Sequence, residues 1–332
     1  MELIKRLSGI VTLAAGRLGL ILLQVLSIRI MTSTMVAGEI GRFYLFAAVQ
    51  AFVYLILGNA PREYVQRNYL DWRLSGEQGH ALGLVVLYGI LLAMITFGLV
   101  IAGLYFSIIS SSVGLGLAAG AVGLWMLGTY LLGVTVPLIN LLGFRILFVS
   151  TRVVAVSIGL AGASILVIHY KSYSEFWIYG LTTGLLTVGI GVVATLIKYD
   201  KIKFSNIVVT SSRSRNFLWT QKDSGIAFMW PIMVTSSMYW IQGQGFRFPL
   251  SLVTSEAMLG GFSIAYSMGA NVVVAAESVI MLSIIPGYYK KISGFDKADS
   301  RDAWRDYVAV VIPIYFLLCG FSVLAGPFML RI

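Results

Sequence analysis

An arginine lies in the middle of the first apolar stretch of the sequence. Arg17 has at least seven residues of the expected membrane span 9–30 on each side. A charge at mid-membrane costs about 2.5–3.5 kcal/mol on insertion scales, so it usually faces a cavity or a partner. Gln24 follows two helical turns later and therefore lies on nearly the same face. This polar stripe would suit a phosphate-bearing ligand, because a guanidinium group matches phosphate oxygens in a bidentate way.

Arg17 also has a plainer interpretation, in which its side chain reaches the headgroups or pairs with a carboxylate. The only acid well inside an expected span is Glu277, in the stretch 258–285. Glu277 could bind a coupling proton or cation during transport. It could equally be the structural partner of Arg17, or lie nearer the cytoplasmic side.

Uncharged polar residues and further arginines complete the set of candidates. Gln50 and Asn271 lie within expected spans, where they could line a cavity or form interhelical hydrogen bonds, worth about 0.6 kcal/mol each. Arg29, Arg42 and Arg247 lie near the outer ends of spans, where they could form a basic ring or contact lipid headgroups. The candidate substrate-binding cavity consists of Arg17, Gln24, Gln50 and Arg247, with Glu277 as the coupling candidate.

The residue types needed for metal binding or covalent catalysis are scarce. The chain has one cysteine, Cys319, and two histidines far apart in sequence, His80 and His169. These cannot form a spaced metal motif or a disulfide framework. An enzyme would also need carboxylates, Arg or His clustered on a sizeable loop, whereas the expected outer loops are short. We therefore expect no metal, no cofactor and no catalytic activity.

The composition identifies the class of protein that must position these residues. Of the 332 residues, 58% are hydrophobic and 11% are charged, against about 45–50% and about 25% in soluble domains. So few charges could not cover a soluble surface of this size. This excludes a cytosolic enzyme, a nucleic-acid-binding domain and a disordered protein. The 35 glycines suit transmembrane helices that pack closely. The expected fold class is all-α, a polytopic membrane protein.

A helix needs about 20 apolar residues to cross a bilayer. Nine stretches meet this requirement, at roughly 9–30, 41–60, 81–107, 113–136, 147–168, 176–197, 225–242, 258–285 and 307–328. With these spans, 18 of the 24 basic residues fall at the N-terminus and in the even-numbered loops, five fall on the other side, and Arg17 lies within the membrane. The positive-inside rule then places the N-terminus in the cytoplasm and residues 108–112 outside.

The spans fall into two groups. Residues 1–200 are expected to form a six-helix bundle, 201–224 a basic cytoplasmic linker, and 225–332 three helices of a second bundle. The matching residues are Thr34, Ala37 and Gly41 with Thr254, Ala257 and Gly261, at an offset of 220. Because six spans precede the second unit, both units share one orientation, as in a parallel repeat about an axis along the membrane normal.

The chain resembles the multidrug/oligosaccharidyl-lipid/polysaccharide exporter superfamily, most closely its polysaccharide branch, the O-antigen (Wzx-type) flippases. The resemblance rests on "TSTMVAGEIGRFY" at 32–44, "GFRFPLSLVTSEAMLGGFSIAY" at 245–266 and "IIPGYYKK" at 284–291. It implies two helical bundles around a central cavity. It also implies translocation of undecaprenyl-diphosphate-linked oligosaccharide across the bacterial inner membrane by alternating access. The implied partners are this lipid-linked substrate, membrane lipids, a polysaccharide polymerase and chain-length proteins, but not nucleic acid.

Two other functions remain open from the sequence. A cation-coupled multidrug exporter of the same superfamily would need an acidic and aromatic cavity, whereas Arg17 favours an anionic substrate. A membrane enzyme of polysaccharide assembly, a polymerase or a glycosyltransferase, is the third reading. Two complete bundles would need roughly 440 residues, twice the repeat offset. We therefore expect residues 1–332 to be a fragment that lacks about three to five helices.

Overall fold

The computed structural model describes most of the chain up to residue 270. It covers residues 2–111, 113–170, 172–200, 202, 212–267 and 269–270, and isolated helical residues between 301 and 320. Within these residues the structure is helical and contains no strand, as the expected all-α class requires. The chain divides into two compact units, Met1–Gly261 and Phe262–Ile332.

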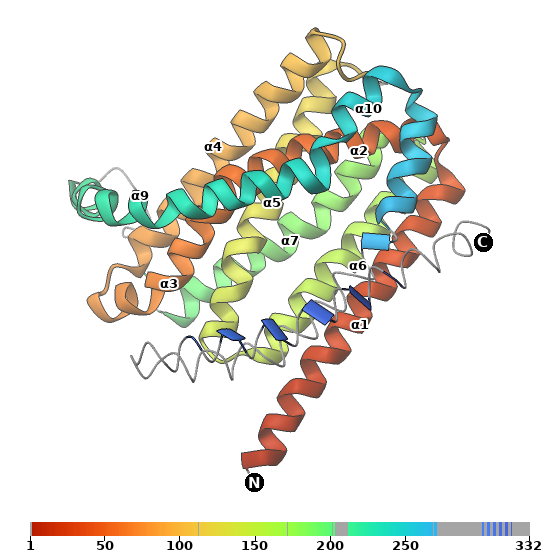
Figure 1. Cartoon of the computed structure of the whole chain (residues 1–332). Coiled ribbons are helices and arrows are strands. Elements are labelled where there is room, and N and C mark those ends of the chain that lie inside the picture. The colour runs from red at the N-terminus through yellow and green to blue at the C-terminus, as the bar shows by residue number, and fades with distance from the viewer. Residues whose placement is uncertain are drawn as a thin grey trace. The chain divides into compact units, whose positions relative to one another are not determined.

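The first unit is a bundle of long helices joined by short turns (Figure 1). In chain order the elements are α1 (Glu2–Thr34), α2 (Ala37–Val53), the π-helical turn η1 (Tyr54–Gly58), α3 (Asn59–Ser75), α4 (Gln78–Tyr105), α5 (Leu115–Leu141), α6 (Arg145–His169), α7 (Ser174–Tyr199), α9 (Ser212–Trp240), the π-helical turn η2 (Ile241–Gly245) and α10 (Arg247–Val253). Residues 256–261 are again helical.

Among the residues that the structure describes, five helical stretches are long and apolar enough to cross a membrane. They are Ala37–Ser75, Gln78–Tyr105, Leu115–Leu141, Arg145–His169 and Ser174–Tyr199. They coincide with the second to sixth spans expected from the sequence, and they are compatible with a multi-pass membrane protein. Within α1, Leu18–Thr34 is a shorter apolar stretch. The expected span 307–328 and the second half of 258–285 lie largely outside the described residues.

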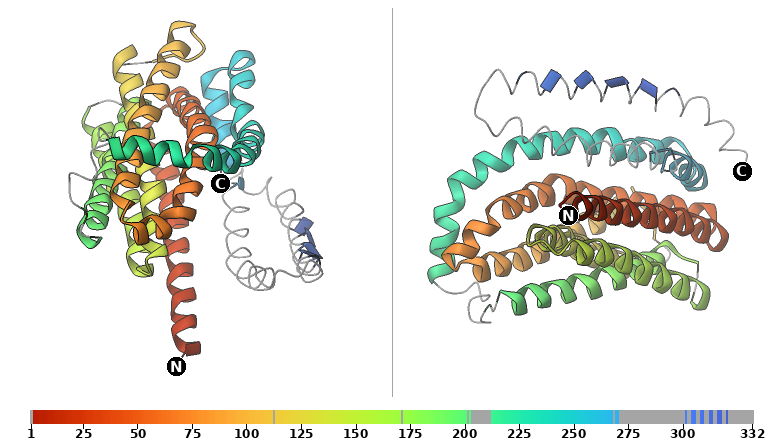
Figure 2. Two further views of the ribbon diagram at one scale, coloured as in Figure 1. Left: turned by 90° about the vertical axis from the view of Figure 1, so that its left-hand side faces the viewer. Right: turned by 90° about the horizontal axis from the view of Figure 1, so that it is seen from below.

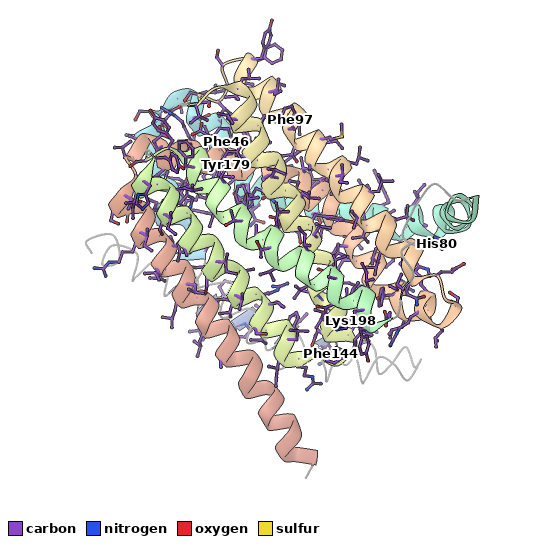
Figure 3. All side chains as sticks on the ribbon, turned by 180° about the vertical axis from the view of Figure 1, so that it is seen from behind. Phe46, His80, Phe97, Phe144, Tyr179 and Lys198 are labelled. Carbon is purple, nitrogen blue, oxygen red and sulfur yellow. The ribbon has the colours of Figure 1, made fainter. Side chains whose placement is uncertain are left out.

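The helices pack in two layers. Neighbouring pairs α1 and α6, α6 and α7, α7 and α5, and α5 and α4 lie against each other. The α2–α3 helix packs on α4 and α5 of this layer, and α9 contacts α3 and η1 (Figure 2). Seen from behind, Phe46 and Tyr179 lie near one end of the bundle and Phe144 and Lys198 near the other (Figure 3).

Glycine sets the distance between α6 and α7. A Cβ atom placed on Gly180 would lie 2.1 Å from the Cα of Ala163, far inside van der Waals contact. In lipid there is no hydrophobic driving force between helices, so their association depends on close packing. Small residues allow the two backbones to come into contact and gain this packing energy. The high glycine content of the sequence thus has a direct structural role at this contact.

The second span does not end at Pro61 as predicted. α2, η1 and α3 form one continuous helical stretch that passes through Pro61 and ends at Ser75. Proline has no N–H to donate to the carbonyl four residues earlier, that of Leu57. The hydroxyl of Tyr88 donates to this carbonyl instead, at 2.9 Å. The missing backbone donor is replaced from a neighbouring helix, so the helix continues.

Two predicted connections therefore differ from the structure. Arg62, Arg67 and Arg73, expected in a loop, lie on α3. The actual turn is short and includes Gly76, whose φ of 77° is left-handed and favours glycine. Similarly, α9 begins at Ser212, so the second half of the expected linker 201–224 is helical and runs into the expected seventh span. A polar segment can extend a helix beyond the membrane, which composition alone does not reveal.

Candidate functional site

Of the predicted cavity residues, the structure describes the side chains of Gln24, Gln50 and Arg247. The backbone of Arg17 lies in α1, but its side chain is outside the described residues, as is the whole of Glu277. Gln24 is exposed on α1, a helix that packs on α6. Gln50 and Arg247 are both buried and both lie at α2, the first within it and the second against it. These two are the predicted site residues that the structure brings to one helix.

Arg247 is enclosed by polar and aromatic groups. Arg247 is only 3% exposed. Its Nη1 donates a hydrogen bond to the side-chain oxygen of Gln244. The guanidinium carbon lies 4.8 Å from the ring centre of Tyr44 in α2 and 5.6 Å from that of Phe246. Cation–π contacts of this kind strengthen when the cation is desolvated. The guanidinium is buried in this structure, so a ligand can reach it only when the residues around it move.

Gln50 makes an interhelical contact. Its amide nitrogen lies 3.7 Å from the sulfur of Met126 in α5, a weak hydrogen bond to a thioether acceptor. The sequence left two roles open for Gln50, a place in the cavity wall and an interhelical hydrogen bond, and this contact is of the second kind. A role for Gln50 in binding a ligand stays a prediction.

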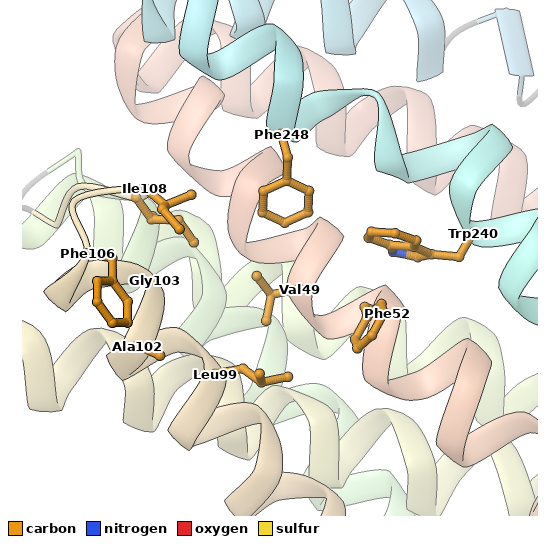
Figure 4. Close-up of a pocket in the computed structure, with 10 residues that line it drawn as sticks. Val49, Phe52, Leu99, Ala102, Gly103, Phe106, Ile108, Trp240 and Phe248 are labelled. Atoms are coloured by element: carbon orange, nitrogen blue, oxygen red, sulfur yellow. The ribbon is translucent and has the colours of Figure 1, made fainter.

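An apolar pocket lies between α2, α4, α9 and α10 (Figure 4). Its volume is about 320 Å³, at the lower end of the range for ligand sites, about 300–1,000 Å³. The lining residues are Val49, Phe52, Leu99, Ala102, Gly103, Phe106, Ile108, Ile109, Trp240 and Phe248. The indole N–H of Trp240 donates to the carbonyl of Ala48 at 3.0 Å, which fixes the ring beside the pocket. Such a lining suits a hydrocarbon chain or an aromatic group.

A group of charged and hydroxyl side chains gathers near the N-terminal end of α2. We call it the polar cluster; it comprises Glu39, Arg42, Ser110, Ser111, Ser174, Glu175 and Glu256. Arg42 donates to Glu39 at 2.8 Å through Nη1 and to Glu256 at 2.9 Å through Nε. The hydroxyl of Ser110 also donates to Glu256. The cluster thus joins α2 to the turn before α5 and to the segment after α10.

The same cluster caps α7. The first backbone N–H groups of a helix have no partner within it and carry a partial positive charge. Glu39 accepts a hydrogen bond from the backbone N–H of Ser174, the first residue of α7, at 3.0 Å. The carboxylate of Glu175 accepts from the hydroxyl of Ser111 at 2.8 Å. Both carboxylates are buried, so these bonds compensate for lost hydration.

The sequence analysis missed the two acids of this cluster that bind Arg42. Arg42 was assigned to a basic ring or to headgroup contact, whereas its partners are carboxylates. The spacing of Glu39 and Arg42, three residues apart on one helix, was an available signal for the first pair. Glu256 is 214 residues away from Arg42, and no local pattern could join them.

A second charged site lies at the other end of the bundle. Arg73 in α3 pairs through Nε with Asp200 at 2.8 Å, and the hydroxyl of Tyr69 donates to the same carboxylate at 2.7 Å. The Asp200 side chain is only 1% exposed. This carboxylate, directly after α7, holds the helical extension α3 to the bundle.

Among the described residues there is no group of three His, Cys, Asp or Glu side chains placed to hold a metal ion. What the arrangement offers is binding and positioning: a buried cation, an apolar pocket beside it, and ion pairs that hold helix ends together. Comparison of the chain with protein-family models, with curated proteins and with solved structures finds no match.

Proposed function

We propose that the chain is a flippase that moves undecaprenyl-diphosphate-linked oligosaccharides across the bacterial inner membrane by alternating access. One observation carries this proposal. Two adjacent residues of α10 have different roles: Arg247 carries a buried guanidinium group, and Phe248 lines the apolar pocket. A cation beside an apolar pocket, among helices able to span a membrane, suits a ligand that joins an anionic group to a hydrocarbon chain.

In this proposal no covalent bond is made or broken. Arg247, with Arg17 and Gln24 of the first span, would bind the diphosphate, since guanidinium groups match phosphate oxygens. Gln50 lines the same route, and Glu277 is the candidate for ion coupling. The N-terminus and the end of the bundle with Asp200 face the cytoplasm, and the polar cluster faces the periplasm. The partners are membrane lipids, a polysaccharide polymerase and chain-length proteins.

A second candidate is a cation-coupled multidrug exporter. The pocket is rich in aromatic side chains, among them Phe52, Phe106 and Trp240, and aromatic faces attract organic cations. The acids of the polar cluster are partly neutralised by Arg42, so the cluster is a weaker attraction for a cation. The enzyme reading has no comparable support in the described residues.

Ligand competition separates the two candidates. The purified chain in lipid nanodiscs would be titrated with undecaprenyl diphosphate while the fluorescence of its tryptophans is followed, Trp240 among them. We expect saturable binding that a lipophilic cation such as tetraphenylphosphonium does not displace. Saturable binding of the cation, with none of the diphosphate, would support the exporter and contradict the flippase.

A further inference from the structure

The segment after α10 and the start of α2 touch through their backbones. A Cβ atom on Gly41 would lie 2.0 Å from the carbonyl oxygen of Glu256, and one on Gly260 would lie 2.4 Å from that of Ala37. No side chain larger than hydrogen fits at either glycine without a shift. Glycine at both positions is therefore what allows this crossing.

The two contacts mirror each other. Ala37 and Glu256 differ by 219 in residue number, and so do Gly41 and Gly260. Exchanging the two segments therefore turns one contact into the other, as in an isologous interface. This offset of 219 differs by one residue from the sequence offset of 220, and Gly261, the sequence partner of Gly41, meets nothing within 4 Å. The symmetry of the crossing is therefore local and does not follow the register of the sequence repeat.

A side-chain clamp lies over this crossing. The Nε of Arg42 lies 2.9 Å from a carboxylate oxygen of Glu256, and the two side chains are 20% and 35% exposed. The hydroxyl of Ser110 donates to the other oxygen of Glu256. The pair is only partly buried, so water and salt screen part of its attraction and keep it weak. A weak pair can break and form again within a transport cycle.

The crossing shares a hydrophobic cluster with the wall of the pocket and closely follows Arg247 along the chain. Leu259, between the contacts of Glu256 and Gly260, is fully buried in one hydrophobic cluster with Leu45 and Val49. Val49 also lines the pocket. α10 ends at Val253, only three residues before Glu256, so a closed crossing restricts the movement of α10 away from α2.

We infer that the Arg42–Glu256 pair is a latch, which holds the crossing of residues 37–41 and 256–260 closed and must open for a ligand to reach Arg247. The role of the latch in transport rests on the proposed function. Its opening is a property of the protein that is measurable without a substrate.

Cysteine labelling measures the opening. In a Cys319→Ser background, Leu259→Cys places a thiol at a fully buried position of the crossing. We expect slow reaction with a maleimide, and a rate about three- to five-fold higher when Glu256→Gln or Arg42→Gln is added, in line with a weak exposed pair. The double variant should react no faster than either single one, because both remove the same contact.

Glu63→Gln is the matched control, because Glu63 pairs with Arg62 on α3 at similar exposure. It should leave the labelling rate unchanged. Rates that do not differ among Glu256→Gln, Arg42→Gln and the parent, in proteins of normal thermal stability, would overturn the latch.

A disulfide provides the second test. A Cβ atom on Gly38 would lie 4.0 Å from that of Glu256, within the range that a disulfide needs. Oxidation of Gly38→Cys with Glu256→Cys should abolish binding of undecaprenyl diphosphate, and reduction should restore it. Equal binding by the oxidised and reduced forms would contradict the latch. Absence of binding in both forms, and in the parent, would count against the proposed function, and the labelling rates would still decide the latch.

Discussion

The hydroxyl of Tyr88 in α4 donates a 2.9 Å hydrogen bond to the backbone carbonyl of Leu57, the group that Pro61 leaves without its helical donor. This bond lets a proline lie inside a helix that runs from Ala37 to Ser75. It also fixes α4 to the π-helical turn η1. π-Helical turns are uncommon and are frequently found at functional sites.

Removing this hydroxyl should destabilise the protein. Tyr88→Phe leaves the Leu57 carbonyl unsatisfied, which costs about 1–3 kcal/mol. Adding Pro61→Ala should recover part of the loss, because alanine supplies an N–H four residues after Leu57. The thermal unfolding midpoint in detergent measures both effects. If the change in unfolding midpoint of the double variant equals the sum of the changes in the two single variants, the Tyr88 hydroxyl does not replace the N–H that Pro61 lacks.

The contact between α6 and α7 makes a prediction about two glycines of the same helix. Gly180→Ala forces a methyl group into the backbone of Ala163, and overpacking costs about 1–3 kcal/mol. At Gly191 a Cβ atom would meet nothing within 4 Å. Gly191→Ala should therefore be neutral, or stabilising by up to about 1 kcal/mol through helix propensity. The two variants are compared by thermal unfolding in the same detergent, and equal midpoints would contradict the packing argument.

The ion pair of Arg73 and Asp200 should respond asymmetrically. Arg73→Met leaves a buried carboxylate without its cation, which is the costly way to break an ion pair. Asp200→Asn leaves a partly exposed guanidinium that water can solvate, and the asparagine oxygen still accepts from Tyr69. We expect the first variant to lose clearly more stability, measured by thermal unfolding. A larger loss of stability in Asp200→Asn than in Arg73→Met would contradict the argument that the buried carboxylate depends on its cation.

The orientation can be tested with two exposed residues at opposite ends of one helical stretch. Val36 directly precedes the span Ala37–Ser75, and Leu74 is its last residue but one. Val36 is 68% exposed and Leu74 is 89% exposed. In a Cys319→Ser background, Val36→Cys should react with an impermeant thiol reagent in intact cells, and Leu74→Cys only after lysis. The opposite pattern would reverse the topology derived from the positive-inside rule.

Hydropathy located the helices well where long apolar runs end at short turns. The expected spans 81–107 and 147–168 differ by only a few residues from α4 and α6. The prediction was wrong at Pro61, because the group that replaces its N–H comes from Tyr88, on another helix. Residues 212–224, which composition assigned to the linker 201–224, are helical and continue into α9; their role as a linker stays a prediction.

The candidate site was less predictable than the spans. Arg247 was identified from its charge and position, but its burial against Tyr44 depends on how α10 packs on α2. The partnership of Arg42 with Glu256 depends on a backbone crossing between segments 219 residues apart, which one sequence does not reveal. Arg17 and Glu277 remain predictions.

The central claim is that a buried cation beside an apolar pocket binds an anionic lipid. The most direct measurement is the affinity of the purified chain for undecaprenyl diphosphate in nanodiscs, compared among the parent, Arg247→Lys and Arg247→Ala. We predict a loss of about tenfold or more for Arg247→Ala, since hydrogen bonds to charged groups contribute about 1.5–3 kcal/mol. Arg247→Lys should lose less, because it keeps the charge but not the bidentate geometry. Equal affinities for all three proteins would contradict the account.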